Sequence, residues 1–171
     1  MRSIAVPSKA VSIHSRKLLL SLHVVVTVSA LGTDLVLLTL GIAGLSGADP
    51  QTIYPAAHLV SAWVVAPLAF LALGTGLLLG LLTPWGLFRY WWVTIKFAIT
   101  ILFVPVVLFI LVPRLSTLAS TVTASPASPL SIGQRVPLVI APVIASSLLV
   151  LNVFLAIFKP GGRLRRNNDA R

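Results

Sequence analysis

The apolar run Leu18–Leu45 is the feature that most limits how this chain can fold. It is long enough to cross a bilayer, for which about 20 apolar residues suffice, and its only titratable side chains are His23 and Asp34. At 3.6 residues per turn, these two residues lie within roughly 20° of each other on one helix face. Ionisable groups in membrane helices are costly and usually face a bundle interior or a cavity. We therefore expect this face to point inward.

Three further apolar runs, at about 58–82, 91–112 and 136–158, share this character. In the whole chain 57% of residues are hydrophobic and 9% are charged, whereas soluble domains carry about 25% charged residues. The sequence therefore predicts an all-α, polytopic membrane protein. One membrane domain is expected over 16–158, between a short segment 1–15 and a basic tail 159–171. The chain has no cysteine, which excludes disulfides, thiolate metal sites and a cysteine nucleophile.

Basic residues flank the first and the last apolar runs. Arg16 and Lys17 precede the first run, and Lys159, Arg163 and Arg165 follow the last. Since Lys and Arg accumulate on the cytoplasmic side, we expect both termini in the cytoplasm and an up-down-up-down bundle of four helices in a bacterial-type inner (plasma) membrane. The same charges predict contact with anionic lipid. No nucleic-acid site is expected, because no aromatic residue interleaves with the charges of the tail.

Two connections are expected on the outer side of the membrane. Ser46–Ala56 is rich in Gly, Asp and Pro, which is typical of turns. Ser116–Arg135 is rich in Ser, Thr, Ala and Pro and is predicted to be a flexible loop. An alternative interpretation of the N-terminal region is a secretory signal with a cleavage site near Ala30. Cleavage would leave the apolar remainder LVLLTLGIAGL in water, so we expect the first span to be retained.

Polar or small groups from all four spans are predicted to share one depth, roughly 10 Å from the inner flank of each helix at ~1.5 Å per residue. The members of this inner layer are His23, Thr75, Gly76, Lys96 and Asn152. A second layer nearer the outer face is predicted to contain Asp34, His58 and Arg114. An alternative interpretation of Lys96 is that its side chain extends the ammonium group to the lipid headgroups and has no functional role. The shared depth favours a common binding site.

Short motifs in the first and third spans resemble those of known membrane proteins. Leu22-His23 followed by Leu31-Gly32 resembles the first helix of the CopD-like proteins, and Trp92-x-x-x-Lys96 is similar to the HemJ-type protoporphyrinogen oxidases. The resemblance implies a small helical bundle that holds b-type haem or a porphyrin. It also implies that His23 is the axial iron ligand and that Lys96 is the partner of a porphyrin propionate. The Leu-Pro-Arg segment that the HemJ type carries after its first helix is absent, so whether the chain is an enzyme stays open.

The residue chemistry suits haem better than copper. Haem iron accepts neutral imidazole, and an apolar bundle favours that form of His23. No second histidine lies at the level of His23, so bis-histidine ligation is not expected. Copper(I) sites prefer Cys and Met, which the spans lack. Two other functions remain open: a non-enzymatic structural or accessory subunit of a larger membrane complex, and transport of a small solute or metal. The assembly expected is a homo-oligomer or a larger membrane complex.

Overall fold

The computed structural model describes residues 13–82, 87–125 and 129–159, which form four long helices. The first is α1 (Ile13–Leu45). The second joins α2 (Pro50–Val60), η1 (Ser61–Val65) and α3 (Ala66–Leu82), and the third joins α4 (Trp91–Val106), η2 (Val107–Leu111) and α5 (Val112–Ala124). The fourth comprises α6 (Ile132–Arg135) and α7 (Pro137–Phe158).

By length and composition, all four helices can cross a membrane. Within the described residues, this confirms the prediction of an all-helical chain with four helices long and apolar enough to span a membrane. The predicted N-terminal segment up to residue 12 and the basic tail over 160–171 lie outside the described residues.

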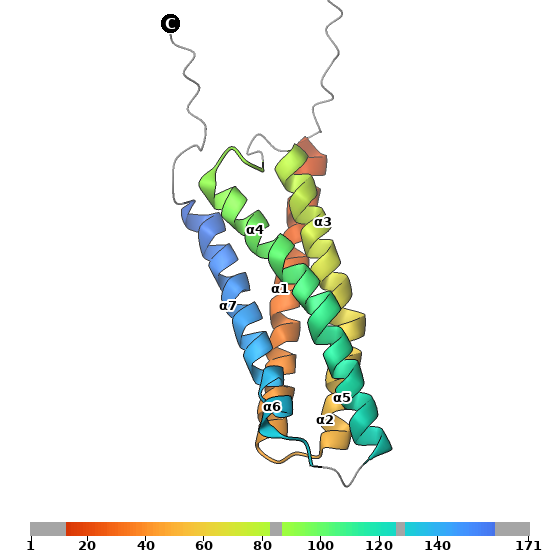
Figure 1. Ribbon diagram of the computed structural model, residues 1–171. Coiled ribbons are helices and arrows are strands. Elements are labelled where there is room, and N and C mark those ends of the chain that lie inside the picture. The colour runs from red at the N-terminus through yellow and green to blue at the C-terminus, as the bar shows by residue number, and fades with distance from the viewer. Residues whose placement is uncertain (1–12, 83–86, 126–128, 160–171) are drawn as a thin grey trace, which may run out of the picture.

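The helices surround a common axis. α1 packs against α3 on one side and α7 on the other, while α4 contacts both α3 and α7, and α5 packs against α2. Figure 1 shows the start of α1, the end of α3 and the end of α7 at one end of the molecule, here called the Arg16/Lys159 end. The α1–α2 connection and α6 lie at the opposite end, here called the Asp49 end.

The second long helix begins at Pro50, inside the segment predicted to be a turn, and not near residue 58. Asp49 is its N-cap: the carboxylate accepts hydrogen bonds from the Gln51 backbone N–H at 3.2 Å and from the Thr52 hydroxyl at 2.8 Å. Pro50 occupies the first turn, where proline is favoured because no N–H is needed there. Asp-Pro, which often marks turns, here starts a helix.

The prediction of a flexible loop over 116–135 is wrong for its first part, because α5 continues to Ala124. The helix buries a stripe formed by Leu115, Leu118 and Val122, which follows the i, i+3, i+7 spacing of an amphipathic helix. The hydroxyls between them bond back to the helix backbone, as Thr121 does to the Thr117 carbonyl at 2.8 Å. The hydroxyl groups of these Ser and Thr residues therefore find acceptors within the helix and do not disrupt it.

Each of the two π-turns ends just before a proline. η1 is followed by Ala66 and Pro67, and η2 by Val112 and Pro113. Proline has no N–H, and its ring crowds the carbonyl four residues earlier. In both turns the residue before the proline bonds to a carbonyl five residues back, as Ala66 does to Ser61. The wider turn thus accommodates the proline inside a continuous long helix.

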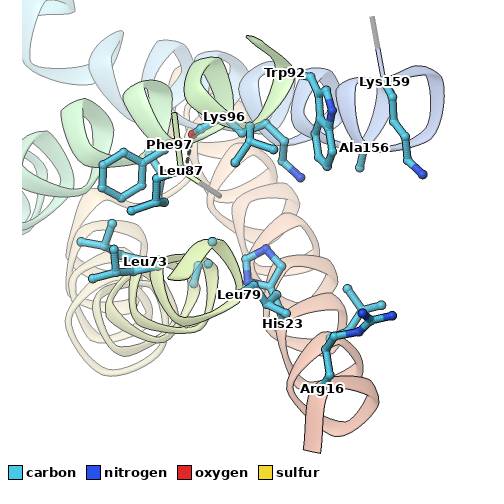
Figure 2. A pocket seen from close by; sticks show the side chains of 17 residues that line it. Arg16, His23, Leu73, Leu79, Leu87, Trp92, Lys96, Phe97, Ala156 and Lys159 are labelled. Carbon is cyan, nitrogen blue, oxygen red and sulfur yellow. Dashed lines mark hydrogen bonds between the residues drawn. The ribbon is translucent and has the colours of Figure 1, made fainter. Parts of the chain in front are cut away.

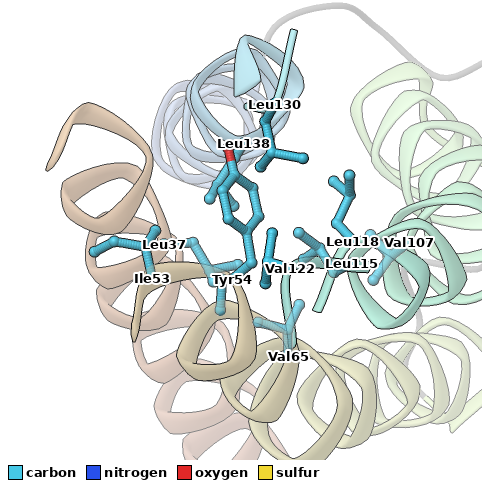
Figure 3. Close-up of a cluster of buried hydrophobic side chains, with 11 residues drawn as sticks. Leu37, Ile53, Tyr54, Val65, Val107, Leu115, Leu118, Val122, Leu130 and Leu138 are labelled. Carbon is cyan, nitrogen blue, oxygen red and sulfur yellow. The ribbon is translucent and has the colours of Figure 1, made fainter. Parts of the chain in front are cut away.

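Buried apolar side chains gather in the half of the bundle nearer the Asp49 end (Figure 3). Tyr54 is at the centre of this core, with 1% of its surface exposed. α1 and α7 also approach closely here: a Cβ built on Gly41 would lie 2.5 Å from the Leu138 carbonyl oxygen. Pro142, one turn later in α7, has no N–H to offer that carbonyl. This core is packed tightly around Tyr54, and the cavities begin beside it and extend toward the Arg16/Lys159 end.

Candidate functional site

Two cavities lie inside the bundle, and His23 and Lys96 line both of them. The first, of about 380 Å³, lies toward the Arg16/Lys159 end. The second, of about 420 Å³, follows the bundle axis. Its lining on α1 runs from Leu20 to Leu37, which corresponds to about 25 Å at ~1.5 Å per residue. Both volumes fall in the range of small-molecule pockets, roughly 300–1,000 Å³.

His23 is held by a hydrogen bond between α1 and α3. Its Nδ1 lies 2.8 Å from the Thr75 hydroxyl oxygen, and that hydroxyl lies 2.6 Å from the Leu71 carbonyl. A threonine hydroxyl has one proton, which it donates to the carbonyl. It therefore accepts from His23, so the proton of the imidazole is on Nδ1. The other ring nitrogen, Nε2, keeps its lone pair.

Gly76 leaves space for the His23 ring beside α3. A Cβ at this position would lie 3.3 Å from the imidazole Cε1, closer than an ordinary van der Waals contact. The absence of a side chain thus allows the ring to lie against the helix backbone. Thr75 and Gly76 together set the position of the ring, one by a hydrogen bond and the other by leaving room.

Lys96 projects into the same space from α4. Figure 2 shows the Lys96 side chain and the His23 ring extending into the pocket from different helices. Trp92, one helical turn before Lys96, also lines the first cavity, as residues four apart share a helix face. Arg16 and Lys159 also line this mostly apolar cavity, so that three cationic side chains, with Lys96, border it.

Asn152 brings α7 to the site as a fourth helix, beside α1, α3 and α4. It lies on α7 and lines the second cavity together with His23 and Lys96. Its side-chain oxygen is buried and has no hydrogen-bond partner within the described residues. The inner layer expected from depth alone is thus assembled around shared cavities, because His23, Lys96 and Asn152 all face the bundle interior.

The structure does not bring the second predicted layer together at these cavities. Asp34 lines the second cavity, but neither His58 nor Arg114 does. Arg114 is exposed, and its guanidinium donates to the Gly133 carbonyl at 3.0 Å, while the buried His58 Nδ1 has no hydrogen-bond partner in the described part of the chain. Arg114 follows η2, and a π-turn rotates the residues after it relative to a regular α-helix. The geometry of an ideal α-helix therefore does not predict which way the Arg114 side chain faces.

Other lining residues were not singled out as site residues from the sequence. Arg16 lies seven residues before His23, which places both on one face after two helical turns. Thr100 follows Lys96 by four residues, and its hydroxyl donates to the Lys96 carbonyl at 2.9 Å. Both spacings are visible in the sequence. The position of Lys159 beside the first cavity depends on how α7 ends, with Lys159 in a left-handed conformation at φ 46°.

Comparison of the chain with protein-family models, with curated proteins and with solved structures found no match. Among the residues that the structure describes, no three His, Cys, Asp or Glu side chains are grouped as a metal site would require.

Proposed function

We propose that the chain is a four-span protein of a bacterial-type inner membrane, with alternating helix directions and with the Arg16/Lys159 end in the cytoplasm. The cations Arg16, Lys17 and Lys159 at this end support that orientation under the positive-inside rule. The Asp49 end also carries two arginines. Their guanidinium groups donate to backbone carbonyls, Arg114 to Gly133 and Arg135 to Leu130. They therefore have a structural role on the outer side.

We further propose that the cavities hold b-type haem or a related porphyrin, as the resemblance to the CopD-like and HemJ-type proteins implies. The observation that carries this proposal is the hydrogen bond between His23 Nδ1 and the Thr75 hydroxyl. Because Thr75 accepts the Nδ1 proton, the Nε2 lone pair is available to iron. The residues fit the group, since the lining is mainly apolar and the imidazole is held in one orientation.

The cations around the first cavity suit the acidic edge of a porphyrin. Porphyrins of the haem type are flat and apolar with carboxylates at one edge, and a charge-assisted hydrogen bond to a carboxylate is stronger than a neutral one. Lys96 lies deepest, while Arg16 and Lys159 lie nearer the end of the bundle. In this arrangement Lys96 binds a carboxylate and Arg16 and Lys159 favour its approach. Bound haem would supply one-electron redox chemistry.

The proposal is tested by titrating the purified protein in detergent with hemin and, separately, with metal-free protoporphyrin. The wild type is expected to bind both. His23→Ala should weaken hemin binding strongly and protoporphyrin binding little, because only hemin uses the Nε2 lone pair. Lys96→Met should weaken both. If neither compound binds to folded wild-type protein, the proposal fails and the accessory-subunit interpretation is favoured.

A further inference from the structure

Asp34 is a buried acid that the proposed haem site does not use. It is the only acidic residue within the four apolar helices. Only 6% of its surface is exposed, and it lines the second cavity. No hydrogen bond or ion pair joins its carboxyl group to another described residue. Asp34 therefore does not stabilise the fold through a polar partner among these residues.

The surroundings of Asp34 in the cavity are apolar. At the end of the second cavity where Asp34 lies, the lining includes Leu37, Val65, Val107 and Leu111. An ionised carboxylate without a partner is very unfavourable in such surroundings. The group must therefore carry a proton or be approached by a cation. A carboxyl group that faces a cavity can do either reversibly, whereas one sealed in a packed core cannot.

The other titratable groups around Asp34 leave the cavity itself sparsely charged. His23 on the same helix and Lys96 on α4 are the other titratable residues that line it, and α3 and α7 contribute none. The titratable residues of the remaining elements packed against α1 do not line the cavity: they are Tyr54, His58 and Arg135. Since Lys96 brings positive charge into the same cavity, a second cation is disfavoured there, and a proton is the better ligand.

We propose that Asp34 is a proton-binding site inside the membrane, which exchanges its proton with the Arg16/Lys159 end through the two cavities. The cavities share lining residues, including His23 and Lys96. Between His23 and Asp34 the same face of α1 carries Thr27, which also lines the second cavity. The cavity volume of about 420 Å³ is far above the ~30 Å³ that one water occupies. Water therefore has room to carry the proton.

The proton site at Asp34 does not depend on the ligand at His23, but a porphyrin bound there would share the cavities through which the proton is exchanged. Membrane-embedded carboxyl groups that face cavities are typical of proton relays, and Asp34 has this position whether or not a ligand binds at His23. Failure of hemin to bind would leave the inference about Asp34 standing. Likewise, an inert Asp34 would leave the haem proposal standing.

A hydrophobic carbodiimide tests the protonation of Asp34 in the wild-type protein, so no variant has to fold. The carboxyl proton passes to a carbodiimide nitrogen while the carboxylate oxygen adds to the central carbon. The acyl group then moves to nitrogen and leaves a stable N-acylurea, which peptide mass spectrometry locates. Asp49 is the internal control, because it is exposed and its carboxylate caps α2.

The expected result is about tenfold more adduct at Asp34 than at Asp49, because an apolar reagent partitions into apolar surroundings and the Asp49 carboxylate is exposed and accepts hydrogen bonds. The yield at Asp34 should fall as the pH of the reaction is raised, because the reaction consumes the carboxyl proton. Absence of the adduct from folded protein would overturn the inference. So would a yield that does not change with pH, since that would indicate a proton that never leaves.

A second measurement tests the route. The chain has no cysteine, so Thr27→Cys gives a unique thiol in the second cavity. It should react with a membrane-impermeant thiol reagent added on the side of the Arg16/Lys159 end. Thr39→Cys is the matched control, since Thr39 lies on the same helix but is exposed and outside the lining of both cavities. A Thr27→Cys protein that is no more reactive than Thr39→Cys would overturn the proposed route.

Discussion

The Thr75 hydroxyl lies 2.8 Å from Nδ1 of His23 and joins α3 to α1 inside the membrane domain. Because the same hydroxyl donates to the Leu71 carbonyl, the contact fixes the imidazole tautomer. Partners of this kind commonly orient histidine ligands, and their loss reduces metal affinity about 10- to 100-fold.

Thr75→Val is therefore expected to lower the affinity for hemin about 10- to 100-fold. Valine has a similar shape but cannot accept the Nδ1 proton. Thr75→Ser keeps the hydroxyl and should retain most of the affinity. Absorption titrations of both variants measure the difference. Equal affinities of the valine and serine variants would show that the hydrogen bond does not position His23.

Gly76→Ala is expected to weaken hemin binding several-fold. The new methyl group would lie 3.3 Å from the His23 Cε1, so the ring has to move by a few tenths of an ångström. Gly74→Ala is the control, because a Cβ at Gly74 meets nothing within 4 Å and lies on the same helix. Titration of the two variants side by side should separate the local contact from a general effect of alanine on α3.

Lys96→Met is expected to have opposite effects on stability and on binding. A lysine inside a membrane domain is costly, so its replacement should raise the melting temperature of the ligand-free protein. The same change should remove the preference for protoporphyrin over its dimethyl ester, because the ester lacks the carboxylates. Lys17→Met is the control, since Lys17 is exposed and lines neither cavity. A preference for the free acid that survives in Lys96→Met would exclude Lys96 as the carboxylate partner.

Gly41→Ala is expected to destabilise the bundle without a direct effect on the site. Its Cβ would lie 2.5 Å from the Leu138 carbonyl oxygen and 2.8 Å from the carbonyl carbon, so α1 and α7 have to separate. Overpacking of this kind costs about 1–3 kcal/mol. Gly32→Ala, where the new Cβ meets nothing within 4 Å, should leave the melting temperature in detergent unchanged or slightly raised. A Gly41→Ala protein as stable as Gly32→Ala would contradict the close helix contact.

The four apolar helices could be predicted because the length of an apolar run is enough to identify a helix that can span a membrane. The convergence of His23, Lys96 and Asn152 could be anticipated from depth, since each is reached along a regular stretch of helix from the same end. The position of Arg114 could not be predicted in this way, because Arg114 follows a π-turn that the hydrophobic periodicity of the sequence does not indicate. The helical α5 was missed because its buried stripe of Leu115, Leu118 and Val122 is hidden among Ser and Thr.

Other features needed the folded chain. The tautomer of His23 depends on Thr75, which lies on a different helix. The two residues are 52 positions apart in the sequence, so no local sequence pattern links them. The helix start at Asp49 uses residue types, Asp and Pro, that also form turns, so composition does not separate the alternatives. The burial of Asp34 beside a cavity likewise follows from how the helices pack.

The most direct test of the account is the reduced-minus-oxidised absorption spectrum of the protein purified from cells supplied with haem. The account predicts a b-type haem spectrum in the wild type that is lost in His23→Ala and retained in His58→Ala, whose histidine lines neither cavity. A haem spectrum that is unchanged in folded His23→Ala protein would contradict it.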